Sequence, residues 1–344
     1  MAEEKTEEKI TEKKEEKKEE KKELRFSVSA TPHVRDKSST RSIMGMVLMG
    51  LLPATIVGVV HFGPRALLIL LLSIGSCILS EWGFCAVTKQ KNTAVDLSCV
   101  VTGLLLGLNL PVSVPVWIPV LGGFFAIVVV KMLFGGLGQN FMNPALGARC
   151  FLVLSFTKYM TDFSYRPGWR AAADVVSGAT PLAEVKNGAS WNVMNMFLGN
   201  EAGTIGETSA LAILIGGLFL IAMDVISWHV CLTYIGSLMI FVCIFGGHGI
   251  DPAYLAAHVY GGGLMLGAFF MATDYVTRPI TKKGQVIYGI FLGILTGIFR
   301  IFGPGAEGVS YAIIIGNLLV PLIERISEPK HFGYKKPGKE RAKA

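Results

Sequence analysis

Long apolar runs constrain this chain more than any other feature. Ten apolar segments follow one another after a charged start, at residues 43–61, 65–87, 94–110, 115–134, 144–157, 208–226, 229–246, 255–272, 284–301 and 309–326. About 20 apolar residues in a helix cross a hydrocarbon core roughly 30 Å thick. A transmembrane barrel would show shorter segments of alternating hydrophobicity. The sequence therefore predicts an all-α polytopic membrane protein with about ten transmembrane helices.

Charged residues are concentrated at the two ends of the chain. Residues 3–23 contain ten Glu and eight Lys and offer no apolar side to bury, so we expect residues 1–25 to form a disordered cytoplasmic tail. A membrane domain over 26–327 and a basic tail over 328–344 follow. The net charge of +7 reflects basic loops of the kind found on the cytoplasmic side of membrane proteins. We expect the lipid bilayer, and no nucleic acid, as a partner.

The positions of Lys and Arg predict the orientation in the membrane. Basic residues cluster at 89–91, at 278–283 and in the C-terminal tail. An even number of spans places both termini on one side, and the positive charge makes that side cytoplasmic. The long connection at 158–207 is then extracytoplasmic.

Two halves of the chain resemble each other. Gly103-Leu-Leu-Leu-Gly107 recurs as Gly263-Leu-Met-Leu-Gly267, and a proline recurs at the same offset of 160 residues. Five spans in each half would make the halves enter the membrane from opposite sides. This predicts a five-plus-five inverted repeat, which is the plan of many transporters.

A glycine-rich loop joins the fourth and fifth apolar segments. It reads Gly135-Gly-Leu-Gly-Gln-Asn-Phe-Met-Asn-Pro144. Asn143 before Pro144 is typical of a helix N-cap and first helical residue. Capping does not account for Asn140. Two carboxamides at this spacing can offer paired donors and acceptors to a planar heterocycle, so ligand binding is the alternative interpretation.

Ionisable and sulfur-bearing residues within the apolar segments give no clear site. Most of the charged ones lie near span ends, where snorkelling to the interface explains them, and we assign no ion path: Glu81, Lys131, Asp224, Arg300 and Glu324. The six cysteines form no C-x-x-C pair and are expected to be small buried hydrophobes. The six histidines show no metal-ligand spacing, so we expect no metal site.

A stretch of small and polar residues, Asp174-Val-Val-Ser-Gly-Ala-Thr180-Pro, lies between the apolar segments. An isolated tetrapeptide of this kind is usually an ordinary turn or helix start, with Pro181 at the first helical position. The alternative is that small residues and the proline leave the Thr180 hydroxyl open to a modifying enzyme.

The surrounding motifs favour the second interpretation. The stretch resembles the D-x-x-S/T-G-A-T signature at which flavin transferases attach FMN to threonine through a phosphoester. The loop 135–144 and the segments 205–209, 272–279 and 307–321 accompany it in the same order. Over about residues 25–327 the chain resembles the family that contains the D subunit of the Rnf complex and the B subunit of the sodium-translocating NADH:quinone reductase.

This resemblance implies a flavin-carrying electron-transfer component of an ion-translocating oxidoreductase. Such complexes couple electron transfer between ferredoxin and NAD+ to movement of Na+ or H+. Thr180 would carry covalent FMN. The transferase would recognise the residues before it, which are Asp174, Ser177, Gly178 and Ala179.

The resemblance also implies partners and a location. Asn140 and Asn143 would contact a non-covalent riboflavin. The other subunits of the Rnf complex and the flavin transferase would be partners, with iron–sulfur clusters and the NADH site on sister subunits. The protein would reside in the bacterial cytoplasmic (inner) membrane.

Three alternatives stay open. The quinone-reductase homologue tends to carry an N-terminal extension involved with quinone, whereas residues 3–23 offer no apolar surface for one, which favours the Rnf protein. A non-redox channel or solute transporter would suit the glycine-rich inverted repeat equally well. A purely structural component is the third alternative. The flavin content of the purified chain separates the flavin-carrying redox protein from the channel or transporter and from the structural component.

Overall fold

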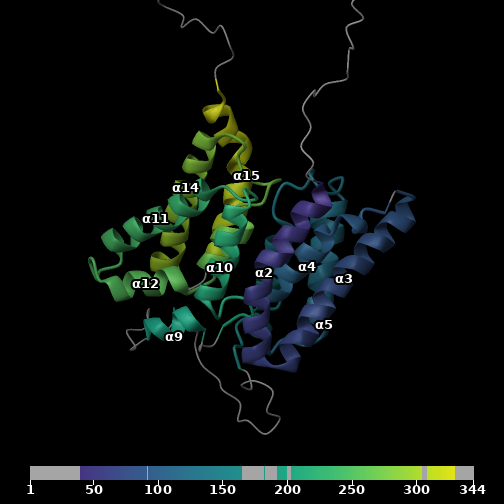
Figure 1. The fold of residues 1–344 in the computed structure, drawn as a ribbon, viewed down its shortest axis with the longest axis horizontal. Coiled ribbons are helices and arrows are strands. Elements are labelled where there is room, and N and C mark those ends of the chain that lie inside the picture. Colours follow the sequence, from purple (N-terminus) through teal and green to yellow (C-terminus); the bar gives the residue numbers. More distant parts are fainter. Residues whose placement is uncertain are drawn as a thin grey trace, which may run out of the picture. The chain divides into compact units, whose positions relative to one another are not determined.

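The computed structural model describes residues 39–90, 92–164, 182, 192–199, 203–303 and 308–329, and every regular element in these ranges is helical. The first half contains α2 (Thr40–Phe62), α3 (Pro64–Thr88), η1 (Ala94–Asp96), α4 (Ser98–Leu108), α5 (Trp117–Phe124), η2 (Phe125–Met132), α6 (Pro144–Ser155) and α7 (Thr157–Met160). The second contains α9 (Val193–Leu198), α10 (Ala210–Ala222), α11 (Trp228–Phe245), α12 (Pro252–Tyr260), α13 (Leu264–Leu266), η3 (Gly267–Met271), α14 (Lys282–Phe302) and α15 (Val309–Ser327). Figure 1 shows their arrangement.

All ten apolar segments are helical, but they differ in length. Five helices in the described part are long and apolar enough to cross a membrane: α2, α3, α11, α14 and α15. A sixth span results if α12 and the α13–η3 segment, bent by 60° at their junction, count as one. The four remaining apolar helices have 10–17 residues. At 1.5 Å per residue they are shorter than a hydrocarbon core of about 30 Å. The all-α membrane class is confirmed, whereas the count of ten complete spans is not.

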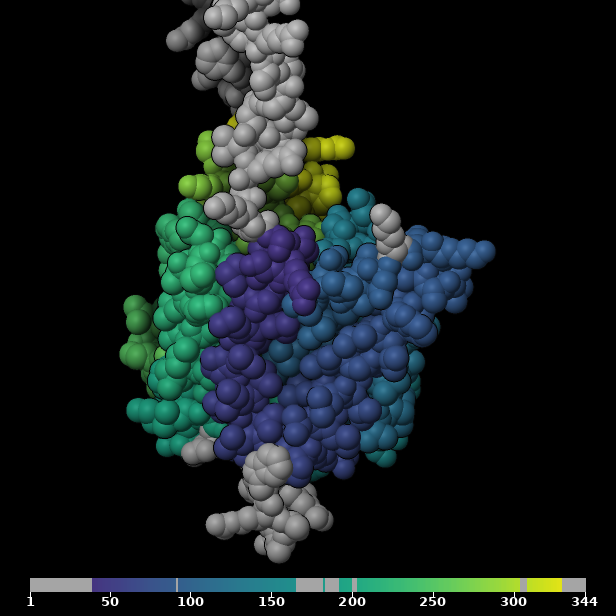
Figure 2. Space-filling model, turned by 45° about the vertical axis from the view of Figure 1, so that its right-hand side comes forward, coloured from purple at the N-terminus to yellow at the C-terminus, as the bar shows by residue number. Residues whose placement is uncertain are grey.

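The two halves repeat the same order of packing. In the first half α3 packs against α4 and α5, and in the second α11 packs against α12 and α14. The halves meet where α2 packs against α10, side by side in Figure 2, and where α6 packs against α15. The recurring glycine motif lies in the third segment of each half, in α4 and at the α12–α13 break. This order agrees with the expected five-plus-five repeat.

A stripe of small residues lets α11 and α14 approach closely. Gly289, Gly293 and Gly297 recur every four residues along one face of α14. A Cβ atom on Gly293 would collide with the Ser237 hydroxyl and would lie 2.7 Å from backbone atoms of α11. Small residues at such spacing are typical of helix packing in membranes, where close backbone approach replaces the hydrophobic driving force.

Helix α4 lies inside the first half. Ten of its eleven residues are buried, and it packs against α2, α3, α5 and α6. Gly103 allows this, because a Cβ atom there would lie 2.7 Å from the Cα of Ile74 on α3. The long helices instead expose apolar side chains outward, such as Met49, Leu52 and Ile56 on α2. Such faces suit contact with lipid.

The elements from Thr40 onward have two distinct ends. The beginning of α2 and the end of α15 lie at the upper end in Figure 1, and α9 lies at the lower end. The lower end also holds the last turn of α2, where a Cβ on Gly58 would meet the backbone of Ile205. The loop with Asn140 and Asn143 belongs to the upper end, since it shares a pocket with Met44 of α2.

Candidate functional site

Glycines shape the loop between η2 and α6. Gly135, Gly136 and Gly138 have φ values of +113°, +93° and +94°. Only glycine adopts this region without strain. The loop thereby turns after η2 and leads through Asn140 to the start of α6.

Asn143 is the N-cap of α6. Its Oδ1 accepts hydrogen bonds from the backbone N–H groups of Ala145 at 3.1 Å and Leu146 at 3.4 Å, and Pro144 occupies the first helical position. The capping interpretation is therefore confirmed. Because the cap uses Oδ1, only the Nδ2 donor of this carboxamide is left for a ligand.

Asn140 has a different environment. The residue is 6% exposed, and its Nδ2 donates to the carbonyl of Met142 at 3.0 Å. Its Oδ1 is buried and has no hydrogen-bond partner in the described structure. A buried acceptor without a partner costs about 1–3 kcal/mol. A ligand that donates a hydrogen bond to Oδ1 would remove that cost. A flavin ring carries such a donor in its imide N–H group.

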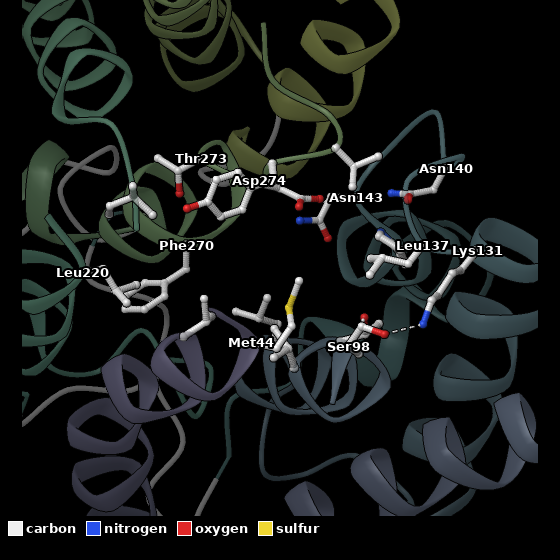
Figure 3. A pocket seen from close by; sticks show the side chains of 18 of the residues that line it. Met44, Ser98, Lys131, Leu137, Asn140, Asn143, Leu220, Phe270, Thr273 and Asp274 are labelled. Atoms are coloured by element: carbon white, nitrogen blue, oxygen red, sulfur yellow. Dashed lines mark hydrogen bonds between the residues drawn. The ribbon is translucent and has the colours of Figure 1, made fainter. Parts of the chain in front are cut away.

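Both asparagines line a pocket between the two halves (Figure 3). The loop also contributes Leu137 and Pro144. The remaining lining residues are Met44 and Val47 of α2, Ser98, Val101, Thr102 and Leu105 of α4, Lys131 of η2, Leu220 and Ile226 in and after α10, and Phe269, Phe270 and Thr273 to Val276 in and after η3. The four lining residues from α4 lie on one face of that helix. The cavity volume is about 70 Å³, well below the roughly 300 Å³ of pockets that hold drug-sized ligands. Side chains must therefore move before a flavin ring can enter.

Both π-helical segments contribute to this pocket. Lys131 lies in η2, and Phe269 and Phe270 lie in η3. Short π-helical stretches occur often at functional sites, because the wider turn redirects side chains. Neither segment could be recognised in the sequence, where both read as ordinary apolar helix.

Asp274 brings an acidic side chain to the pocket rim. It follows η3 and lies across the cavity from Ser98 and Met44 in Figure 3. Burial raises the pKa of its carboxyl group, while hydrogen bonds from the backbone of Val276 and the side chain of Thr277 act in the opposite direction.

Asn317 of α15 joins the glycine loop to the segment after η3. With its carboxamide oriented to satisfy both ends, Nδ2 donates to the Thr277 carbonyl at 3.2 Å and to the Tyr288 hydroxyl at 2.6 Å. Its Oδ1 accepts from the backbone N–H of Asn143 at 3.2 Å. Three motifs that carry the family resemblance, 135–144, 272–279 and the region around Asn317, thus meet at one place. Sequence reasoning had not assigned Asn317 or Asp274 to the site.

Snorkelling proves to be the wrong explanation for three charged residues. Glu81, Lys131 and Arg300 are all buried. Glu81 pairs with Lys131, and Arg300 donates to the carbonyls of His258, Gly261 and Gly262. A further buried pair joins Arg149 of α6 to Glu207 at 3.1 Å, and Arg149 also donates to Asn109 at 2.8 Å.

Asp174, Ser177, Gly178, Ala179 and Thr180 lie outside the described residues. Leu182, two positions after Thr180, is buried. Its Cδ2 atom lies 2.7 Å from the point where a Cβ on Gly262 would stand, and the Arg300 guanidinium lies 2.8 Å from that point. Leu182 therefore packs beside the last turns of α14, at the end of the molecule opposite Asn140.

Comparison with known proteins gives a consistent result. Residues 27–333 match the NQR2, RnfD, RnfE family. The chain is 46% identical to the D subunit of the Na+-translocating ferredoxin:NAD+ oxidoreductase complex of Acetobacterium woodii, over 92% of this chain and 98% of that protein. It is 38% identical to the D subunit of the proton-translocating complex of Clostridium ljungdahlii, over 90% and 96%. It is 35% identical to the D subunit of the ion-translocating oxidoreductase complex of Stutzerimonas stutzeri, over 88% and 95%. With its helical membrane fold and near-complete match, the chain belongs to the NQR2, RnfD, RnfE family.

Proposed function

We propose that this chain is the D subunit of an ion-translocating ferredoxin:NAD+ oxidoreductase complex. The observation that carries the proposal is 46% identity to a D subunit over nearly the full length of both chains. Its partners are the other membrane and peripheral subunits of that complex. The relatives are named for different ions, sodium in one case and protons in another, so similarity alone leaves the coupling ion open.

The pocket at Asn140 and Asn143 is proposed to bind riboflavin non-covalently. Support comes from the unpartnered Oδ1 of Asn140 and from the mixture of aromatic and amide groups around the cavity. A flavin supplies reversible electron transfer when it is bound. The two carboxamides would form hydrogen bonds with the edge of the ring. Apolar side chains of α4 and η3 would contact its faces.

Thr180 is proposed to carry FMN through a phosphoester, attached by a flavin transferase that reads Asp174 to Ala179. The seven-residue signature supports this assignment. Leu182 packs at the end of the molecule opposite the Asn140 pocket. The two flavins would then lie toward opposite membrane faces, and electrons would cross the apolar region between them.

The proposed orientation places both termini in the cytoplasm and the protein in the bacterial cytoplasmic membrane. The end with the Asn140 pocket also carries Arg278 and Lys282, and basic residues mark the cytoplasmic side. A reporter fused at residue 281 should be cytoplasmic and one at residue 190 extracytoplasmic. If both lie on the same side, the proposed separation of the flavins is wrong.

Flavin content is the direct test of the function. The chain expressed with the transferase should give a fluorescent band on a denaturing gel, and Thr180→Val should remove that fluorescence while the protein still inserts. Ser177→Ala keeps the acceptor hydroxyl and should reduce labelling less. A fluorescent Thr180→Val band would show attachment elsewhere. A chain with no flavin in any form would favour a channel, a solute transporter or a purely structural component.

The Asn140 pocket has its own test. Asn140→Leu should release the non-covalent flavin and leave the covalent one in place. Asn140→Asp preserves the size of the side chain and an acceptor oxygen but loses the donor to the Met142 carbonyl, and it should retain more riboflavin than Asn140→Leu. Unchanged riboflavin in Asn140→Leu would mean that this loop serves only to cap α6.

A further inference from the structure

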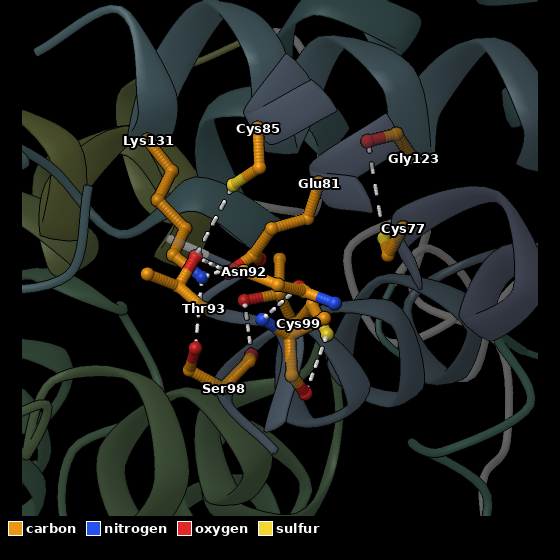
Figure 4. A network of polar contacts seen from close by, with 11 residues as sticks. Cys77, Glu81, Cys85, Asn92, Thr93, Ser98, Cys99, Gly123 and Lys131 are labelled. Carbon is orange, nitrogen blue, oxygen red and sulfur yellow. Dashed lines mark hydrogen bonds and ion pairs between the residues drawn. The ribbon is translucent and has the colours of Figure 1, made fainter. Parts of the chain in front are cut away.

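A buried ion pair lies on the wall of the Asn140 pocket. The Nζ atom of Lys131, in η2, is 2.7 Å from Oε2 of Glu81, in α3. Their side chains are 2% and 0% exposed. Figure 4 shows the two side chains converging from neighbouring helices.

Polar neighbours complete this pair. Lys131 also donates to the Ser98 hydroxyl at 2.8 Å, and the Thr93 hydroxyl donates to Oε1 of Glu81 at 2.5 Å. Ser98 begins α4 directly after Leu97, whose φ of +63° is a left-handed conformation that strains a leucine. The fold thus accepts local strain where it positions the serine.

Only one member of the ion pair faces the pocket. Lys131 and Ser98 both line the cavity, whereas Glu81 does not. The positive end therefore faces the cavity, and the negative end lies behind it against Thr93. Asn140, with its unpartnered oxygen, lines the same cavity.

Stability gives no reason for this arrangement. Replacing a buried ion pair by apolar residues of similar size is often neutral or stabilising, because removing two charges from water offsets their attraction. An electrostatic reason exists if the cavity holds a group whose charge changes. An electron that enters a flavin without a proton adds one negative charge, and in a water-poor cavity a fixed cation stabilises that charge strongly.

We propose that Lys131, held in place by Glu81 and Ser98, sets the reduction potential of the non-covalent flavin in this pocket through its positive charge. The proposal rests on the proposed function of the pocket as a flavin site. The electrons come from the complex's own ferredoxin:NAD+ chain and leave along it. Lys131 forms no bond and gives up no proton. Its charge favours the reduced flavin, and Glu81 limits that effect by partly cancelling the field.

Two single substitutions should shift the potential in opposite directions. Lys131→Met removes the positive end, so the field in the cavity becomes more negative whether or not Glu81 then binds a proton. The reduced flavin should become harder to form. Glu81→Gln keeps the cation and removes the opposing charge, so the reduced flavin should become easier to form. One charge within roughly 10 Å, at an effective dielectric constant near 20, changes the ratio of reduced to oxidised flavin by about tenfold at a fixed potential.

The measurement is a redox titration of the purified full-length chain followed by flavin absorbance. A Thr180→Val background removes the covalent flavin, so the signal reports this pocket alone. Lys131→Arg keeps the charge and should stay closest to the unaltered protein. The double variant Lys131→Met/Glu81→Gln is neutral and avoids a lone buried charge. Its potential should lie between those of the two single variants and below that of the unaltered protein.

Two results would overturn the inference. One is that both single variants shift the potential in the same direction, as general loosening of the pocket would cause. The other is that the double variant retains flavin at an unchanged potential. If the chain with an unaltered pocket binds no flavin, the flavin site itself is wrong, and the redox role of the ion pair falls with it.

Discussion

The contact between α11 and α14 gives a sharp test of the packing. Adding one methyl group as Gly293→Ala would place a Cβ 2.7 Å from the backbone N of Leu238 and the backbone O of Tyr234. Ordinary contact begins at 3.4 Å, so the two helices would have to separate locally by roughly 0.7 Å. The neighbouring hydroxyl of Ser237 can rotate away, but the backbone of α11 cannot.

Gly236→Ala is the matched control on the partner helix. A Cβ at Gly236 meets nothing within 4 Å. Both alanines gain the same helix propensity, about 1 kcal/mol over glycine, so the difference between the two variants reports packing alone. Inserting a methyl group into a tightly packed contact costs about 1–3 kcal/mol.

Thermal unfolding of the purified protein in one detergent is the assay. A difference of 1–3 kcal/mol corresponds to roughly 2–12 °C in Tm, on the scale known for domains of 150–250 residues. Gly236→Ala should match or exceed the unaltered protein, and Gly293→Ala should fall below it. Equal Tm values for the two alanines would show that the helices are not in backbone contact at Gly293.

Three further predictions concern the polar groups. Asn143→Ala should lower stability by about 0.5–2 kcal/mol through loss of the α6 cap, as measured by thermal unfolding, and Asn143→Ser should restore part of it. Arg149→Met should cost about 3–5 kcal/mol because it leaves Glu207 buried without this partner, and adding Glu207→Gln should recover part of that loss. Burial raises the pKa of the Asp274 carboxyl group in the folded state above its unfolded value, so ionising this group costs stability. The cost is absent below the unfolded pKa and grows as the pH rises from the unfolded pKa to the folded pKa. Unfolding at several pH values should therefore show Asp274→Asn gaining stability at neutral pH and losing this advantage in acid.

The sequence predicted the helical membrane class and the cap at Asn143 because both depend on local pattern. Apolar runs near 20 residues and an Asn-Pro pair act over one helix, without reference to the rest of the fold. The number of complete spans was harder, since α4 and α6 read as apolar runs but form helices of only 11 and 12 residues. Hydropathy records composition and does not record where a helix ends within the protein.

Only some of the residues that line the pocket could be recognised in the sequence. Asn140 and Asn143 stood out because they are close together and adjoin glycines. Ser98, Asp274 and Asn317 reach the same region from elements more than 40 residues away along the chain. The spacing of α4 residues 98, 101, 102 and 105 marks one helix face, but a helix buried on nearly all sides gives no polar contrast to show which face lines a cavity.

The burial of α4 has a consequence for biosynthesis. Its neighbours include α5 and α6, which leave the ribosome after it. An 11-residue helix is too short to be held across a bilayer alone, and α4 is fully enclosed only when those later helices have joined α2 and α3 around it. We expect the chain to insert α2 and α3 first and to seat α4 afterwards. The Cys99 side chain packs against Ile127 and Met132 of η2. A ribosome-bound intermediate stopped before α5 and η2 should therefore leave Cys99 open to a water-soluble thiol reagent, and the completed protein should protect it.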